Sequence, residues 1–269
     1  MQEKLRSGAR NQHSGASPFD TPNSFPQAGR EAAQMASPEV ARTEPSAFTL
    51  ARLLTWLSPA YPVGSFSYSH GLEWEVEAGR VNDAASLGAW IEDVLLHGAG
   101  RTDAIFLAAA WRAIATDDTA RLHEVAQLAA AFAPSAERRL ETLAQGAAFM
   151  KATRAAWPHP KLDGLFDDAT EIAYPVAVGA CAAAHGLPLA DTAQAFAQAF
   201  AANIISAGVR LIPLGQTDGL RVVARLEPLI PTVVADALRA DLDDIGGIAV
   251  MADIASMRHE TQYTRLFRS

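Results

Sequence analysis

The feature that most constrains the fold of this 269-residue chain is a long run of helical periodicity from Leu189 to Pro213. In "LADTAQAFAQAFAANIISAGVRLIP", apolar or small residues recur at steps of three and four, namely Leu189, Ala193, Phe196, Phe200, Ile204, Gly208 and Leu211. This spacing places them on one face of an α-helix. Because proline cannot continue a helix, the sequence predicts one long helix with a buried face that stops at Pro213.

A second segment, "SAERRLETLAQGAAFMKATRAAWP", predicts a helix with Ser135 as its N-cap and Pro158 as its stop. Its expected buried stripe consists of Leu140, Leu143, Ala147, Met150, Arg154 and Trp157. Similar patterns predict helices over residues 86–98, 103–116, 118–131, 217–227, 231–245 and 248–260. The sequence has no sustained two-residue alternation and no Asn-Gly hairpin signal, so no strand is predicted. We therefore expect an all-α, single-domain bundle of about eight to ten helices over residues 48–269.

Residues 1–47 differ in composition from the rest of the chain. They are rich in Ser, Pro, Ala and Gln, and their large aliphatic or aromatic residues are Leu5, Phe19, Phe25 and Val40. So little apolar surface cannot offset the conformational entropy lost on ordering, which predicts a disordered leader. The leader also lacks the apolar core of a secretion signal, so we do not expect export.

Charge and cysteine content narrow the class of protein. The formal net charge is −8, and residues 1–47 hold equal numbers of basic and acidic groups, so the negative excess belongs to residues 48–269. A surface of that sign repels phosphate backbones and argues against nucleic acid as a partner.

The longest apolar stretch, Ile172 to Ala184, is too short to span a membrane. The single cysteine, Cys181, forms no intrachain disulfide and suits a cytoplasmic protein.

The segment "SPAYPVGSFSYSHGLEWEVEAG", residues 58–79, holds the residue types of a hydrolase: Ser69 as nucleophile, His70 as base and Glu73 as acid. A nucleophile elbow, however, needs small residues two places on either side of its serine, on a strand-to-helix turn. Ser67 precedes Ser69 in that position, and no strand is predicted. Adjacent side chains also diverge on a helix. An acid-base or serine hydrolase is therefore the alternative hypothesis.

A helix over Tyr68–Glu77 explains the same segment better. It places Tyr68, Leu72 and Val76 on one face and His70, Glu73, Trp74 and Glu77 on the other. An aromatic residue surrounded by His and Glu is typical of the centre of a protein interface, but a neighbouring helix of the same chain could cover Trp74 equally well. The candidate partner-binding residues of this segment are Tyr68, His70, Glu73, Trp74 and Glu77.

A search for metal and phosphate motifs gives no site. The histidines at positions 70, 97, 123, 159 and 185 are far apart, and none has another His within four positions. No phosphate-binding "GxxxxGK[ST]" loop and no "GxGxxG" motif that follows a strand occurs. We therefore predict no cofactor, no metal ligands and no catalytic residues. A direct nickel carrier, with a site assembled through space, remains a further alternative.

The C-terminal segment "MRHETQYTRLFRS" is unusual for a chain end, because it combines arginines with large apolar residues. Its candidate partner-binding residues are Arg258, Tyr263, Arg265, Leu266, Phe267 and Arg268. We expect this tail to dock, either on the acidic body of its own chain or in a groove of a partner. The helix near 248–260 is expected to pack through Ile248, Met251 and Ala255, so a chain ending before Gln262 is predicted to stay folded.

Three segments together resemble the urease accessory protein F family: "LSPAYPVGSFSYSHGLEWEVEAG", "VRLIPLGQTDG" and "DIASMRHETQYTRLFRS". The resemblance covers residues 48–269 in the right order and does not extend to the leader. It implies an all-helical, non-enzymatic chaperone that forms a homodimer. It further implies binding to a second accessory protein, D or H, recruitment and modulation of the GTPase accessory protein G, and nickel delivery to apo-urease by the complex.

Overall fold

The structure, a computed structural model, describes residues 47–166 and 171–269. Over these residues the chain forms eleven α-helices and three short 3-10 helices, and no strand. The all-α prediction is confirmed. The predicted leader lies outside the described residues except for Ala47, at which the first helix begins.

The helices follow one another with short connections. They are α1 (Ala47–Trp56), α2 (Leu72–Glu77), α3 (Ala84–His97), α4 (Ala99–Ala115), α5 (Thr119–Ala131), α6 (Ala136–Ala156), α7 (Tyr174–Ala184), α8 (Leu189–Leu211), α9 (Gln216–Leu226), α10 (Ile230–Arg239) and α11 (Val250–His259). The 3-10 helices are Ser65–Ser67, Pro160–Leu162 and Leu242–Asp244. The long helix predicted from Leu189 is α8, and it ends two residues before Pro213.

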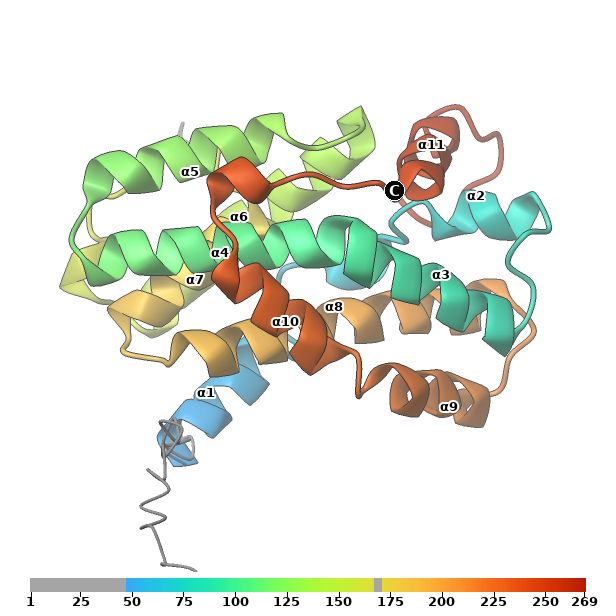
Figure 1. The fold of residues 1–269 in the computed structure, drawn as a ribbon, viewed down its shortest axis with the longest axis horizontal. Coiled ribbons are helices and arrows are strands. Elements are labelled where there is room, and N and C mark those ends of the chain that lie inside the picture. The colour runs from blue at the N-terminus through green and yellow to red at the C-terminus, as the bar shows by residue number, and fades with distance from the viewer. Residues whose placement is uncertain (1–46, 167–170) are drawn as a thin grey trace, which may run out of the picture. The chain divides into compact units, whose positions relative to one another are not determined.

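The centre of the bundle is the packing of α4 against α7 (Figure 1). All residues of α7 except Tyr174 and Ala183 are buried, which explains why the segment from Ile172 to Ala184 is apolar without being a membrane span. At Gly179, an added Cβ would lie 2.3 Å from the carbonyl oxygen of Leu107, so only glycine allows the two helices to approach this closely. No helix in the described part of the chain is both long and apolar enough to cross a bilayer.

Three helix predictions need correction. The helix predicted over residues 231–245 ends at Arg239, and a separate 3-10 helix follows at Leu242–Asp244. The helix predicted over Tyr68–Glu77 begins only at Leu72, because His70 and Gly71 adopt left-handed backbone angles, φ 58° and 79°, that no helix contains. The stripe predicted for α6 is only partly correct, because Met150 is buried but Ala147 is exposed. Leu140 is 63% exposed, whereas Arg138, Glu141 and Gln145 are buried. The inward face of α6 is thus partly polar, and hydrophobic periodicity does not identify a polar buried face.

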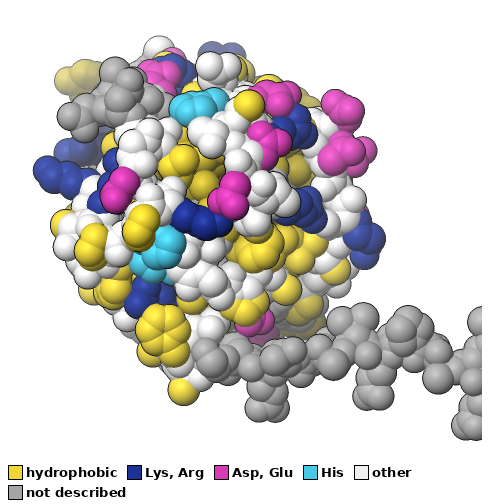
Figure 2. All heavy atoms as spheres, turned by 90° about the vertical axis from the view of Figure 1, so that its left-hand side faces the viewer, with side chains coloured by type: hydrophobic (Ala, Val, Ile, Leu, Met, Phe, Trp, Pro, Cys, Tyr) yellow, Lys and Arg dark blue, Asp and Glu magenta, His cyan; other side chains and the backbone are white. Residues whose placement is uncertain are grey.

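At one end of the bundle, α11 lies beside α2, although nearly the whole described chain separates them in sequence (Figure 1). Figure 2 shows the face on the left of that view, away from α11. There, hydrophobic side chains are interspersed with charged side chains of both signs. The predicted partner-binding residues all belong to the α2 and α11 end.

Candidate functional site

The corner formed by α2, α11 and the C-terminal tail begins with the turn at His70 and Gly71. A side chain at Gly71 would place its Cβ 2.8 Å from the backbone nitrogen of Ser256 on α11. Glycine is therefore required both for the left-handed backbone and for the close approach of α11. The turn directs Ser69 and His70 under the tail and begins α2 at Leu72.

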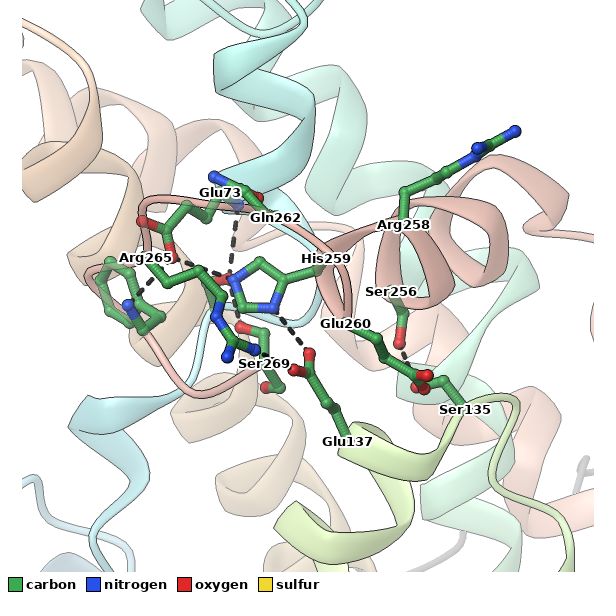
Figure 3. A network of polar contacts seen from close by, with 12 residues as sticks. Glu73, Ser135, Glu137, Ser256, Arg258, His259, Glu260, Gln262, Arg265 and Ser269 are labelled. Carbon is green, nitrogen blue, oxygen red and sulfur yellow. Dashed lines mark hydrogen bonds and ion pairs between the residues drawn. The ribbon is translucent and has the colours of Figure 1, made fainter.

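Glu73 is the residue that joins α2 to the tail. Its carboxylate is buried and accepts hydrogen bonds from the backbone nitrogens of Leu266 at 2.6 Å and Phe267 at 2.9 Å. It also faces Nε2 of His259 at 3.0 Å (Figure 3). A buried charge is costly unless it is paired and hydrogen-bonded, and these three contacts satisfy it.

His259 connects α11 to both neighbouring helices. Its ring is fully buried, with Nε2 on Glu73 of α2 and Nδ1 2.6 Å from Oε2 of Glu137 on α6. Each ring nitrogen therefore lies within hydrogen-bond distance of a carboxylate oxygen. Arg265 of the tail donates to the other oxygen of Glu137 at 2.6 Å. Two carboxylates, the imidazole of His259 and the guanidinium of Arg265 therefore close this network.

The last residues of the tail are held inside the protein. Phe267 is 4% exposed, and the guanidinium of Arg210 lies 4.4 Å from the centre of its ring. The Arg268 nitrogen donates to the Ser67 carbonyl at 2.8 Å, and the Ser69 nitrogen donates to the Ser269 carbonyl at 2.7 Å. Of the two docking modes left open by the sequence, the structure shows the tail on its own chain.

A second polar cluster lies beneath the tail around Glu141 of α6. Its carboxylate accepts from Ser269 Oγ at 2.6 Å, faces His70 Nε2 at 3.1 Å and pairs with Arg138. Burial alone raises the pKa of Glu141, but Arg138, His70 and the hydrogen bond from Ser269 together lower it. Burial, reinforced by the positive charge of Arg138, lowers the pKa of His70 to about 3. His70 is therefore neutral near pH 7 and Glu141 is ionised.

This geometry does not form the hydrolase arrangement. The Ser69 hydroxyl donates to the carbonyl of Ser269, and His70 faces Glu141 rather than Ser69. Glu73 is engaged by the tail and His259. The three side chains of the hydrolase hypothesis thus have separate structural roles.

The candidate partner-binding residues divide into two groups. Tyr68, His70, Glu73 and Phe267 are buried. As interior residues they expose little surface in this structure, and their role in partner binding stays a prediction. Trp74 is half-buried against the core. The exposed candidates are Glu77, Arg258, Tyr263, Arg265, Leu266 and Arg268. Arg258 points away from the polar network (Figure 3). Partner binding by this second group stays a prediction.

The outer face of α11 is a feature that the sequence reasoning missed. Its exposed apolar residues are Val250 57%, Met251 45%, Ile254 40% and Met257 50%, and Ile248, two residues before the helix begins, is 77% exposed; we call these five residues the α11 stripe. Ile248 and Met251 had been expected to pack in the core. The buried side of the helix consists instead of Ala255, Ser256 and His259. The spacing of the stripe is visible in the sequence, but periodicity does not say whether a stripe faces inward or outward.

A cavity of about 210 Å³ lies between the start of α11, the α3–α4 junction and α6. Its polar wall includes His70, Asp103, Arg138 and Asp253. A second cavity of about 150 Å³ shares His70, Asp103 and Arg138 with it and opens toward α8. In the described part of the chain, no group of three or more His, Cys, Asp or Glu side chains is placed to hold a metal ion.

We expect Asp103→Asn to stabilise the protein at about pH 8 and to have little effect at about pH 5. Burial raises the pKa of Asp103 from 3.8 to about 7. The folded state therefore keeps this proton between about pH 4 and 7 while the unfolded chain loses it, so stability falls as pH rises through that window. Asn carries no such charge. Differential scanning calorimetry should show a melting temperature higher by roughly 4 °C or more at pH 8; equal pH dependence in the two proteins would contradict the prediction.

Comparison with known proteins places the chain among urease accessory proteins. The sequence model of the UreF family matches residues 81–227, a region that contains helices α3 to α9. A protein named urease accessory protein UreF from Rhodopseudomonas palustris (strain BisB5) is 58% identical over 222 residues, which is 82% of this chain and 91% of the relative. A protein of the same name from Bradyrhizobium sp. (strain BTAi1 / ATCC BAA-1182) is 55% identical over 85% of this chain and 95% of its own length.

Proposed function

Because this chain belongs to the UreF family of urease accessory proteins, we propose that it is a scaffold that assembles the proteins of urease maturation. It joins a second accessory protein, D or H, to the GTPase accessory protein G, and the complex delivers nickel to apo-urease. In this proposal the scaffold is a cytoplasmic homodimer and modulates the GTPase. Members of this family are accessory proteins, so the chain is not an enzyme.

The observation that carries the proposal is the α11 stripe. Val250, Ile254 and Met257 stand one helical turn apart on the solvent side of α11, each at least 40% exposed. Single exposed apolar residues are ordinary, but a contiguous apolar face on a soluble protein marks an interaction site. A partner that covers this face removes its apolar area from water, which is the main driving force of protein association.

The contacts beneath α11 support the same proposal, because they hold the stripe in one position. The His259 network fixes the end of the helix, Ser256 is hydrogen-bonded to Ser135 of α6, and Gly71 packs against the middle. A surface that is already ordered loses less conformational entropy on binding than a mobile one. The helix is therefore pre-organised to dock.

The chemistry of the partner follows from the surroundings of the stripe. Arg258 directly follows the stripe residue Met257 on α11 and is exposed. An apolar groove with acidic residues at its rim fits such a helix face, since charges at the rim direct association and the apolar centre supplies affinity. We assign this surface to the second accessory protein.

We expect the double substitution Ile254→Glu and Met257→Glu to abolish co-purification of the second accessory protein with no change in helicity. Two carboxylates in an apolar interface cannot be desolvated cheaply, so binding should weaken by about a hundredfold or more. Leu220→Glu is the matched control, because Leu220 is 68% exposed on α9, outside the stripe. The measurement is affinity purification of the tagged chain from its own cells, probed for the accessory proteins and urease. Full recovery of the partner by the double variant would refute the assignment.

A further inference from the structure

Helix α1 exposes apolar side chains on the opposite side of the bundle from α11 (Figure 1). Three buried side chains anchor it to the core, namely Thr49, Leu53 and Trp56. Three large apolar side chains are more than half exposed instead, namely Phe48, Leu50 and Leu54. The smaller residues Ala47, Ala51 and Thr55 are exposed between them, and we call these six residues the α1 face.

Charge is missing from α1 and from the segment that follows it. Arg52 is the one charged residue between Ala47 and Ser69, in a chain of which 19% is charged. The guanidinium of Arg52 lies 4.7 Å from the centre of the Phe48 ring and 5.0 Å from that of the Trp157 ring. Aromatic rings thus hold this cation by cation–π contacts, and the α1 face itself carries no charge.

The neighbouring helix α8 extends this uncharged surface. Helix α1 contacts α8, and no charged residue occurs between Asp191 and Arg210. At steps of four, α8 carries exposed or half-buried residues with small or amide side chains, namely Gln194, Gln198, Ala202 and Ser206. The Asn203 side chain donates to the Ser65 carbonyl at 3.1 Å and so joins α8 to the segment after α1.

The cavity of about 150 Å³ lies where these two parts of the surface meet. Leu57 and Phe66 line it from the segment of α1, and Ala199 and Ser206 line it from α8. Phe66 and Ser206 are exposed, so the cavity reaches the surface. A depression beside an apolar helix accepts a side chain of a facing molecule, as the central pockets of protein interfaces do.

We propose that the α1 face and the adjoining part of α8 form the contact between two copies of this chain. The inference rests on the homodimer of the proposed function and assigns the face that forms it. Two copies of a chain with a formal net charge of −8 repel each other, so they approach closely only where neither presents charge. The α1 face meets this condition on both copies, because a two-fold contact uses the same surface twice.

The composition and the extent of the surface fit such a contact. Interfaces between identical subunits are more apolar than transient ones, and their centres are depleted of charged residues. Leu50 and Leu54 stand one helical turn apart and form a ridge that packs into the groove of a facing helix. A standard interface buries about 800 Å² on each partner. Three large side chains do not supply that area, so the contact includes α8 and the cavity.

Other occupants fit this face less well than a second copy. The surface assigned to the second accessory protein lies on α11, on the other side of the bundle, so both surfaces are free to be occupied at once (Figure 1). A basic partner finds no carboxylate on the α1 face. Helices that bind anionic membranes carry basic side chains beside their apolar face, whereas the one basic residue of α1, Arg52, is held by aromatic rings.

The experiment is sedimentation velocity of the full chain over a range of concentrations, compared with the double variant Leu50→Glu and Leu54→Glu. The wild type should sediment as a dimer at micromolar concentration. A dimer of the variant would have to bury four carboxylates, so its dissociation constant should rise by about a hundredfold or more. Both side chains are exposed in the single chain, so circular dichroism should show unchanged helicity.

Matched variants separate the loss of this contact from other effects. Leu220→Glu adds the same charge at a leucine of α9 that is 68% exposed, against 66% for Leu54, and should stay dimeric. Leu50→Met with Leu54→Met keeps the apolar volume and should also stay dimeric. The thiol of Leu54→Cys should react with a maleimide more slowly in concentrated than in dilute protein, and the native Cys181 is buried.

The outcomes distinguish this inference from the proposed function. A dimeric wild type whose double-glutamate variant is equally dimeric overturns the inference and leaves the homodimer standing. A monomeric wild type overturns both, and if that monomer sediments with phosphatidylcholine vesicles, the α1 face is a membrane contact instead. A dimer that is lost only in the double-glutamate variant supports the inference, even if the wild type captures no accessory protein and the scaffold function is refuted.

Discussion

His259→Ala is expected to lower the free energy of unfolding by about 3–5 kcal/mol. The substitution removes the fully buried ring that contacts Glu73 and Glu137 and leaves both carboxylates without this shared partner. Breaking a buried ion pair by removing one partner is costly, because the remaining charge stays buried and unpaired. Glu73 keeps its two backbone donors and Glu137 keeps Arg265, which places the effect in this range rather than above it.

The measurement for this variant is urea denaturation followed by circular dichroism. Arg258→Ala is the matched control, because Arg258 is the preceding residue on α11 but is exposed and points away from the network (Figure 3). It should change stability by less than about 0.5 kcal/mol. If His259→Ala unfolds at the same urea concentration as the control, the network does not hold α11 in place.

Ending the chain before Gln262 is expected to destabilise the protein by several kcal/mol, whereas the sequence alone predicts only that the truncated chain stays folded. Burial of Phe267 contributes about 1.5–3 kcal/mol, and each backbone hydrogen bond to the Glu73 carboxylate about as much. The truncation also leaves His70 and Glu141 open beneath the missing Ser269. Both α11 and α2 should become mobile, and capture of the second accessory protein should be lost with them.

Hydrogen exchange resolved by peptide and a pull-down on the same sample test this prediction. Amides of α11 and α2 should exchange faster in the truncated protein, whereas those of α4 and α7 keep their protection. Tyr263→Ala is the control for the tail, since its side chain is fully exposed and should not affect stability. Unchanged melting and unchanged protection of α11 would show that the tail is not part of the fold.

Much of the fold follows from local sequence alone. The long helices could be predicted because helix-forming spacing, N-caps and terminating prolines are local features of the sequence. Helices α8 and α6 match their predicted spans closely. Helix α7 carried no amphipathic pattern because nearly all of it is buried. The family resemblance rested on three short segments, two of which form the α2 and α11 corner.

The candidate site could not be predicted from the sequence, because its contacts join residues that are far apart in the chain. Glu73 and His259 are 186 residues apart in the chain, and no local pattern indicates that their side chains meet. The sequence predicts a longer helix in place of α2, with one face that binds a partner, and it predicts a tail that docks. The contacts across the corner instead bury Glu73, His70 and Phe267 and leave α11 as the exposed apolar helix.

The sequence by itself therefore determined that this protein is an all-α bundle with an acidic surface and a family-specific chain end, because helix formation and net charge depend on nearby residues and on composition. Only the tertiary structure decided which face of α6 and α11 turns inward and where the tail lies. The spacing of apolar residues defines a face of a helix but does not say whether that face turns inward. The charges and the space that the neighbouring helices offer decide it. Here the carboxylates of α2 and α6 contact the polar side of α11, so its apolar side faces solvent.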